Sequence, residues 1–116
     1  MARLIEMGYL DDTAFAQGLV RRRSATRGSL AVAAELTAKG IDRQGTAEAL
    51  VELAPESQLA SATLLAERMC PRDTEIGYRE MLDRVGVKLH RRGFPAGIAR
   101  AACRAVLAER HGLQDA

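Results

Sequence analysis

The sequence predicts an all-α protein built from tandem three-helix repeats. Apolar residues recur at spacings of three and four, and no stretch of strand length alternates apolar and polar residues. In addition, residues 36–41 (Leu-Thr-Ala-Lys-Gly-Ile) and 89–94 (Leu-His-Arg-Arg-Gly-Phe) resemble each other at an offset of 53 (89 − 36). The same offset continues through Ala49/Ala102, Leu50/Cys103 and Leu53/Val106. A period of about 50 residues is typical of a helical array.

Each repeated segment is predicted to be a helix end closed by a glycine, Gly40 or Gly93. A glycine just past an apolar helical stripe can adopt the left-handed conformation that satisfies the last carbonyl groups of the helix. The apolar residue that follows then packs on the third-last helical residue. The expected contacts are Ile41 with Leu36 and Phe94 with Leu89.

The first element is expected to be a short terminal helix within residues 1–10 that stops at Gly8. Asp11 and Asp12 then open the next helix, where their carboxylates favour the positive end of its dipole. Because a helix of about two turns does not persist alone, residues 1–10 are expected to be the last helix of an incomplete first repeat.

The first full repeat is expected over residues 11–54, with helices at 13–24, 29–39 and 43–53. Asp42 is a suitable N-cap for the third helix. The predicted apolar stripes are Phe15/Ala16/Leu19/Val20, Leu30/Ala33/Leu36 and Ala49/Leu50/Leu53. Pro55 ends this repeat, since the residue before a proline avoids the helical region.

The second full repeat is expected over residues 55–116, with helices at 56–70, 75–92 and 95–110. Pro95 suits a first helical turn, where its missing N–H is not needed. Gly77 and Gly86 each cost a helix interior about 1 kcal/mol relative to alanine. Gly86 is expected to mark close packing.

The composition indicates a globular helical protein, with 47% hydrophobic and 28% charged residues and a formal net charge of +2. No apolar run approaches the roughly 18 residues of a membrane span. Cys70 and Cys103 lack metal-ligand spacing, so a reduced, cytoplasmic setting fits. Lys39 and Lys88 are the only lysines. Either codon bias or selection for the planar hydrogen-bond donors of arginine explains the preference for arginine over lysine.

Catalysis is not expected. His90 and His111 have no serine or cysteine nucleophile at a meaningful spacing, and the Asp11-Asp12 pair is explained as a helix cap. The sequence contains no phosphate-binding loop of the P-loop or dinucleotide type. We therefore expect no enzyme activity, cofactor, metal site or small-molecule substrate.

The motifs together resemble the bacterial regulatory protein RecX family. They are Gly8-Tyr9-Leu10-Asp11-Asp12 before Phe15-Ala16, then Arg23, Gly28, Glu35-Leu36-x-x-Lys39-Gly40-Ile41 and Leu89-x-x-Arg92-Gly93-Phe94. The resemblance covers nearly the whole chain. It implies tandem three-helix repeats, typically three, so either the start codon is placed late or this is a shortened member.

The same resemblance implies a function in DNA repair, recombination and the SOS response. Family members bind the RecA filament on single-stranded DNA and restrain it without catalysing a reaction. Filament extension, ATP hydrolysis, strand exchange and RecA-stimulated repressor cleavage are then all expected to fall.

Two groups of basic residues are candidates for partner binding. Arg84, Lys88 and Arg91 are spaced by four and three residues, which places them on one helical face. This strip, with Arg92, is expected to meet an acidic protein surface or phosphates. Capping electrostatics alone equally explains Arg92 and its repeat equivalent Lys39.

The second group is Arg21, Arg22 and Arg27, extending toward Lys39. Consecutive helical residues point about 100° apart, so Arg21, Arg22 and Arg23 are expected to splay, with Arg23 over apolar surface. A solvated helix end that complements the dipole is the simpler explanation of this group.

The alternative function is a small basic DNA-binding module of the helix-turn-helix type. Arg43 and Gln44 would begin its recognition helix. Asp42, Glu48 and Glu52 on that helix argue against it, because they would face phosphates. A weak, sequence-independent DNA contact by the arginines is compatible with either function.

Overall fold

Helices joined by short turns and loops form the described chain in the computed structural model, which describes the backbone of residues 2–72 and 75–115 and the side chains of residues 12–72 and 75–110. Their bounds are α1 Ala2–Arg23, α2 Ser29–Ala38, α3 Arg43–Leu50, α4 Pro55–Met69, α5 Tyr78–Met81, the π-helical turn η1 Leu82–Gly86, α6 Val87–Arg91 and α7 Ala96–Asp115. No strand occurs in these ranges, so the predicted all-α fold is confirmed there.

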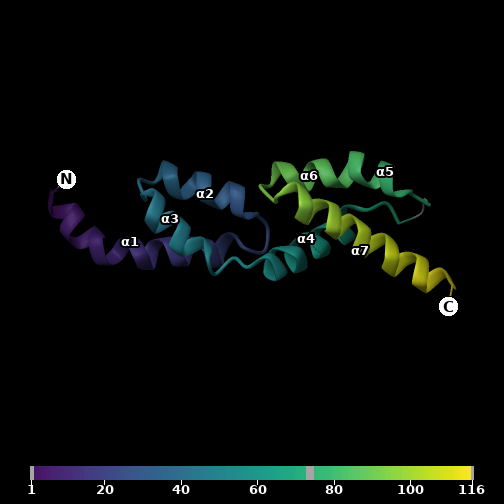
Figure 1. Cartoon of the computed structure of the whole chain (residues 1–116), viewed down its shortest axis with the longest axis horizontal. Coiled ribbons are helices and arrows are strands. Elements are labelled where there is room, and N and C mark those ends of the chain that lie inside the picture. Colours follow the sequence, from purple (N-terminus) through teal and green to yellow (C-terminus); the bar gives the residue numbers. More distant parts are fainter. Residues whose placement is uncertain (1, 73–74, 116) are drawn as a thin grey trace.

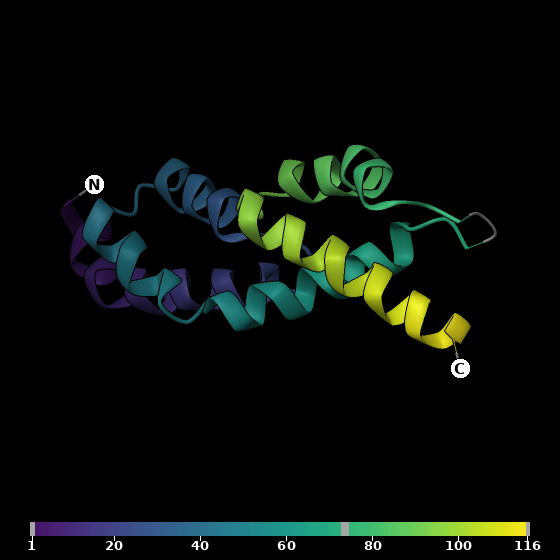
Figure 2. The same cartoon turned by 45° about the vertical axis from the view of Figure 1, so that its right-hand side comes forward.

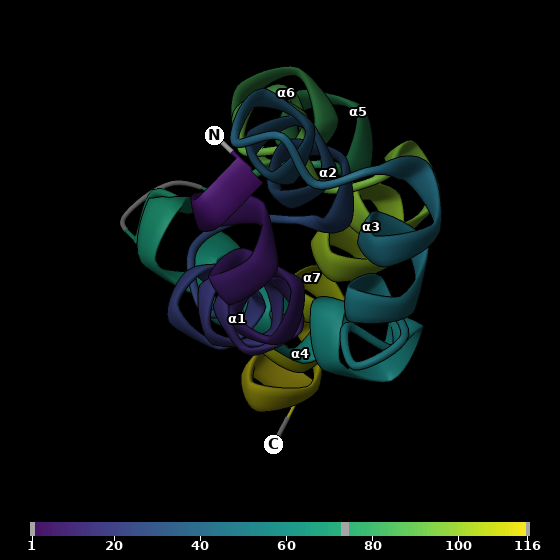
Figure 3. The same cartoon turned by 90° about the vertical axis from the view of Figure 1, so that its left-hand side faces the viewer.

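The molecule is elongated, with principal extents of 61 × 23 × 19 Å. Helices α1 and α4 follow one another along one edge, whereas α2 and α6 lie along the opposite edge (Figure 1). The view down the long axis shows the same two edges, with α3 and α7 beside them (Figure 3). The two termini lie at opposite ends of the long axis. The helices therefore form an array rather than one globular core.

Two separate clusters of buried side chains hold the array together. One lies within residues 16–53 and the other within residues 62–107, and we name the two groups of helices the first unit (α1 to α3) and the second unit (α4 to α7). The offset of 53 residues relates buried positions in both, namely Val32/Val85, Leu36/Leu89, Ile41/Phe94, Ala49/Ala102 and Leu53/Val106. The sequence repeat is therefore a repeat of core packing.

The two predicted glycine corners are present. Gly40 has a φ of 93° and Gly93 a φ of 95°, and no other described residue has a positive φ. In both corners, the amide three residues past the last helical residue donates to the carbonyl of the third-last helical residue, from Ile41 to Leu36 at 3.0 Å and from Phe94 to Leu89 at 3.2 Å. Each expected residue pair is buried within one core cluster.

The helix cap predicted from Asp42 is confirmed. The Asp42 carboxylate accepts a hydrogen bond from the Gly45 amide at 2.7 Å, and Pro55 occupies the first turn of α4. The last helix begins at Ala96, directly after Pro95, and is longer than predicted. Helix α3 ends at Leu50, earlier than predicted, and two turn residues follow.

The prediction that a helix stops at Gly8 is wrong. Helix α1 runs without interruption from Ala2 to Arg23, so Asp11 and Asp12 lie inside it and do not cap it. A glycine inside a helix costs only about 1 kcal/mol, and the good helix formers around Gly8 offset this cost. The predicted boundary between residues 1–10 and 11–54 therefore falls within a continuous helix.

Two apolar stripes are also corrected. Leu30 is 53% exposed, whereas Val32 is fully buried beside Leu36. Leu30 and Leu36 are six residues apart and point about 120° away from each other, while a spacing of four keeps Val32 on the core face. Phe15 is 38% exposed, next to the buried Ala16. The second helix of the second unit begins at Tyr78 rather than residue 75, because Gly77 is its extended N-cap.

The amino end of α2 is capped by the second unit. Its N-cap, Gly28, provides no side-chain hydrogen bond, and the first amides of a helix lack partners within it. The Gly28 amide donates to the Arg92 carbonyl at 3.0 Å, and the Leu30 amide donates to the Gly93 carbonyl at 2.9 Å. The Ser29 amide donates to Oε1 of Gln58 at 2.9 Å. We refer to this contact between residues 28–31 and Gln58 with residues 92–94 as the joint.

The joint requires glycine on both sides. A Cβ atom added at Gly28 would overlap the backbone of Phe94, and one added at Gly93 would overlap Ala31. The carboxyl end of α6 consequently approaches the amino end of α2, and the helix of residues 78–91 lies nearly in line with α2 (Figure 2). Direct backbone hydrogen bonds fix the two units relative to each other.

Gly93→Ala is expected to destabilise the protein by about 2–5 kcal/mol, and Gly40→Ala by only about 1–2 kcal/mol. Both changes impose left-handed strain, but only the Cβ at position 93 also meets Ala31. Urea unfolding followed by circular dichroism measures the difference. Equal losses would show that the joint does not form in solution.

Gln58→Leu is expected to cost about 2 kcal/mol. Gln58 is buried, accepts the Ser29 amide and donates to the Leu53 carbonyl at 3.3 Å, so leucine leaves both groups unsatisfied. Chemical unfolding again measures the effect. Gln44→Leu, at an exposed glutamine of α3, is the matched control and is expected to change stability by less than about 0.5 kcal/mol.

Candidate partner-binding surface

The basic strip of Arg84, Lys88 and Arg91 is exposed along the second helix of the second unit. The opposite face of this helix is buried through Val85 and Leu89. Arg84 forms an exposed ion pair with Glu80 at 3.1 Å. Among the described side chains, neither Lys88 nor Arg91 forms an ion pair. These two cations are therefore available to a partner without breaking an internal contact.

The π-helical turn η1, which the sequence did not predict, carries Arg84. A π turn adds one residue to a helical turn, which shifts Arg84 relative to Lys88 by about one position. Side chains three or four residues apart are both neighbours on a helix, so the strip stays continuous. Gly86 closes this turn and is buried, with Cys103 of α7 as a neighbour, as its predicted role in packing requires.

Arg92 differs from the rest of the strip, because it belongs to the joint. Its Nη1 donates to the Thr26 carbonyl at 3.3 Å, and its own carbonyl accepts the Gly28 amide. Its side chain is half-buried. Its side chain therefore contacts the first unit, and its first role is to hold the two units together.

The three consecutive arginines at the end of α1 splay, as predicted. Arg21 is exposed and lies 4.0 Å from Glu52, and the exposed Arg22 extends back over Gly18. Arg23 was expected over apolar surface, but its Nε and Nη2 instead donate to the two carboxylate oxygens of Glu35 at 3.1 and 3.0 Å. Arg23 therefore links α1 to α2 by a bidentate ion pair.

Glu35 is the centre of a small basic cluster. The hydrogen bond from Arg23 lowers the pKa of the Glu35 carboxyl below its ordinary value, and partial burial opposes this shift. The charges of Arg23, Lys39 and Arg27 lower the pKa further. The exposed Arg27 and Lys39 thus act on one carboxylate, although they come from the two ends of α2.

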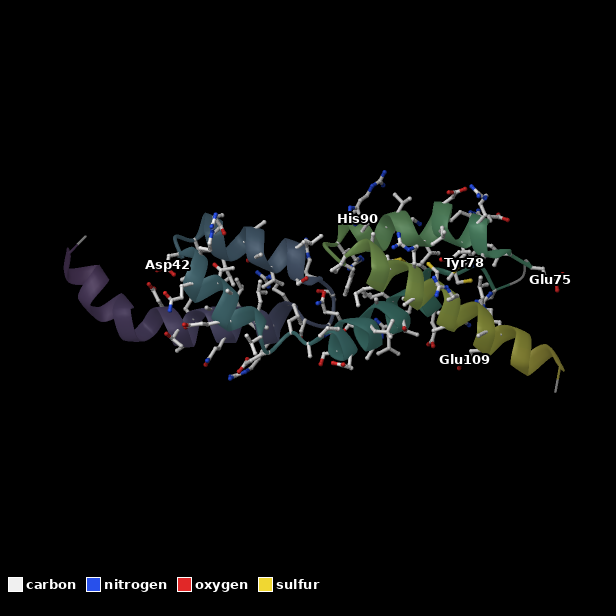
Figure 4. The ribbon with its side chains drawn as sticks, viewed as in Figure 1. Asp42, Glu75, Tyr78, His90 and Glu109 are labelled. Atoms are coloured by element: carbon white, nitrogen blue, oxygen red, sulfur yellow. The ribbon has the colours of Figure 1, made fainter. Side chains whose placement is uncertain are left out.

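A second basic area was missed by the sequence analysis. The Arg104 guanidinium lies 5.6 Å from the centre of the Tyr78 ring, and its Nη2 is 3.4 Å from the Tyr78 hydroxyl. Arg79 and Arg100 are exposed nearby on the same two helices. Figure 4 shows Tyr78 at the end of the molecule away from Asp42, and His90 pointing outward from α6. Tyr78 and Arg104 are 26 residues apart, so no local pattern indicates their contact.

The chemistry of the described residues is that of packing and charge. They contain no group of three His, Cys, Asp or Glu side chains that could hold a metal ion. Burial raises the pKa of the Cys103 thiol, and nearby Cys70 adds to this effect. Cys103 is buried and free. None of the described helices combines the length and hydropathy needed to cross a membrane.

Glu35→Gln is expected to lower stability near neutral pH and to have little effect in acid. The folded-state pKa of Glu35 lies below its ordinary value of 4.5, so its stabilisation is present above that pH and is lost as the pH falls through the folded-state value. Thermal unfolding of the parent chain and of the Glu35→Gln variant across pH measures the gap in stability between them. Asp83→Asn, at an exposed carboxylate without an ion pair among described residues, is the control. A gap that widens in acid would contradict the assignment.

Comparison with known proteins identifies the family. Residues 11–50 match the family model "RecX, second three-helix domain". The "Regulatory protein RecX" of Thermus thermophilus is 33% identical over 114 residues, which is 98% of this chain and 72% of that protein. The protein of the same name from Corynebacterium efficiens is 34% identical over 114 residues, covering 92% of this chain and 54% of its own length.

The protein of that name from Geobacillus kaustophilus is 36% identical over 89 residues, or 75% of this chain, and this match covers 33% of its length. The chain thus spans about half or less of the Corynebacterium and Geobacillus proteins. No solved structure matches the chain. The agreement with the Thermus protein over nearly the whole chain, together with the three-helix domain match, shows that the chain belongs to the RecX family of regulatory proteins.

Proposed function

We propose that this chain is a non-enzymatic negative regulator of the RecA recombinase. It binds the RecA filament on single-stranded DNA and inhibits filament extension, ATP hydrolysis, strand exchange and repressor cleavage. The observation that carries the proposal is membership of a family whose members are named regulatory proteins. With RecA as its partner, the chain acts in the cytoplasm. It takes part in recombination, DNA repair and the SOS response.

The shape of the molecule supports a filamentous partner. The two units repeat the same core positions along a molecule 61 Å long, and the joint fixes the spacing between them. A filament presents identical surfaces at regular intervals, and a rigid array with its own repeat can contact more than one of them. Because the joint is formed by backbone hydrogen bonds, little conformational entropy is lost when the array docks.

The basic strip supplies the proposed contact surface. Lys88 and Arg91 are exposed without ion pairs among the described residues, and Val87 beside them is 43% exposed. Charges with one apolar side chain suit an acidic protein surface, where steering by charge raises the association rate. Arg21, Arg22, Arg27 and Lys39 lie on the first unit and extend positive charge along the molecule.

The helix-turn-helix alternative has weaker support. Helix α3, which would be the recognition helix, is eight residues long and exposes Glu48, and the exposed Glu52 follows in the turn after it. Gln44, at its beginning, donates to Glu48 at 3.2 Å rather than standing free. Carboxylates on that face would meet DNA phosphates. A weak, sequence-independent DNA contact by the arginines remains part of the proposal.

The triple variant Arg84→Ala, Lys88→Ala and Arg91→Ala is expected to need about 10-fold more protein for half-inhibition of RecA ATP hydrolysis. All three side chains are exposed, so helicity and melting temperature stay unchanged. The assay uses preformed RecA filaments on single-stranded DNA, with naked single- and double-stranded DNA titrated in parallel across salt concentrations.

The control variant carries Arg43→Ala, Arg68→Ala and Arg72→Ala, which removes the same charge from exposed positions of α3, α4 and the segment after α4. It is expected to inhibit like the parent chain. If both variants inhibit normally, the strip is not the contact surface. If the parent chain leaves RecA unaffected but binds duplex DNA sequence-selectively, the proposed function itself is wrong.

A further inference from the structure

The joint between the two units has an unoccupied equivalent at the Gly40 corner. Gly40 and Gly93 have the same left-handed backbone, but only Gly93 is covered by the amino end of a helix. A Cβ atom added at Gly40 would meet no described atom within 4 Å, and Lys39 and Gly40 are exposed. The first unit therefore presents the receiving half of the joint to solvent.

This open corner borders a hollow of about 650 Å³ between α1 and α3, whose lining includes Asp12, Gly40, Asp42 and Glu48. Asp12 holds the position in α1 that Gln58 holds in α4. The buried residues of the two helices correspond at an offset of 46 (62 − 16, 65 − 19, 66 − 20), and 58 − 46 gives 12. In the joint, Gln58 accepts an amide at the start of α2. A carboxylate at the same place can accept such an amide and favours the positive end of a helix.

The other half of a joint is exposed at the far end of the molecule. Gly77 is the N-cap of the continuous helix of residues 78–91 and has no side-chain cap. Its backbone angles, φ −84° and ψ 170°, are close to those of Gly28, φ −92° and ψ 175°. A Cβ atom at Gly77 would meet no described atom within 4 Å. Figure 4 shows Asp42 in the half of the molecule that contains the amino terminus, with α1 extending beyond it, and Glu75 and Tyr78 in the opposite half.

The charges of the two ends are also complementary. Asp12, Asp42 and Glu48 line the hollow, with the exposed Lys39 at its corner, whereas exposed Arg79 and Arg104 lie beside Tyr78 at the far end, together with Glu75 and Glu80. The excess negative charge of the hollow would therefore face two guanidinium groups. Such a contact weakens with added salt.

We infer that the Gly40 corner and its hollow bind the amino end of the residue 78–91 helix of a second copy of this chain. Gly77 of one copy then lies against the Gly40 corner of the next, as Gly28 lies against Gly93 within one chain. Because the two halves are at opposite ends, the contact is head to tail and does not close into a dimer. Assemblies therefore grow with concentration. This inference does not rest on the proposed regulation of RecA.

Sedimentation velocity of the 116-residue chain alone, up to about 0.5 mM at low salt, tests the inference. The weight-average mass is expected to rise continuously with concentration, with a Kd of roughly 0.1–1 mM, and to fall back when salt is added. Gly77→Ala is expected to weaken association at least 10-fold, since a Cβ added at Gly28, the N-cap in the joint, overlaps the backbone that it contacts. Its melting temperature is expected to stay unchanged, because that Cβ meets no described atom of the single chain.

Gly97→Ala is the matched control. Gly97 is also exposed, and an added Cβ there meets no described atom, but it lies outside both halves of the joint. This variant is expected to associate like the parent. Asp12→Arg, on the receiving side, is expected to weaken association as Gly77→Ala does. A parent chain that stays monomeric, or a Gly77→Ala variant that associates normally, overturns the inference and leaves the corner to another partner.

Discussion

The left-handed corner at Gly93 is the contact on which the rest of the arrangement depends. It ends α6, positions Phe94 in the core of the second unit, and supplies the carbonyl that receives the Leu30 amide of the first unit. Only glycine has both the positive φ and the absence of a Cβ that this position requires. One residue therefore sets both the fold of a unit and the placement of its neighbour.

The joint also explains why charged surfaces occur where they do. It places the carboxyl end of α6 against the amino end of α2, so the basic strip and the Glu35 cluster lie along the same edge of the array. Arg92 is used internally at this junction, which leaves Lys88 and Arg91 as the exposed cations of α6. A surface formed by two units in this way keeps its spacing only as long as the joint is intact.

Much of the fold was predictable from local patterns. The glycine corners, the Asp42 cap and the Pro55 start each depend on residues within one or two turns, where backbone geometry and capping are local effects. The errors have equally local causes. The predicted helix end at Gly8 overestimated the cost of one glycine inside a helix. The predicted stripe through Leu30 used a spacing of three, where a spacing of four fits the core better. The exposure of Arg84, Lys88 and Arg91 followed from the same periodicity, but their partner stays a prediction.

The sequence by itself determined the helical class, the repeat and the two left-handed corners, because these features depend on residue spacing and on glycine. Only the tertiary structure decided which side chains meet between different helices: Gln58 with Ser29 across the two units, Arg23 with Glu35 inside the first unit, and Arg104 with Tyr78 inside the second. These partners are 29, 12 and 26 residues apart. Their pairing depends on how whole helices dock, and helical periodicity gives the face of a helix but not the neighbour that covers it.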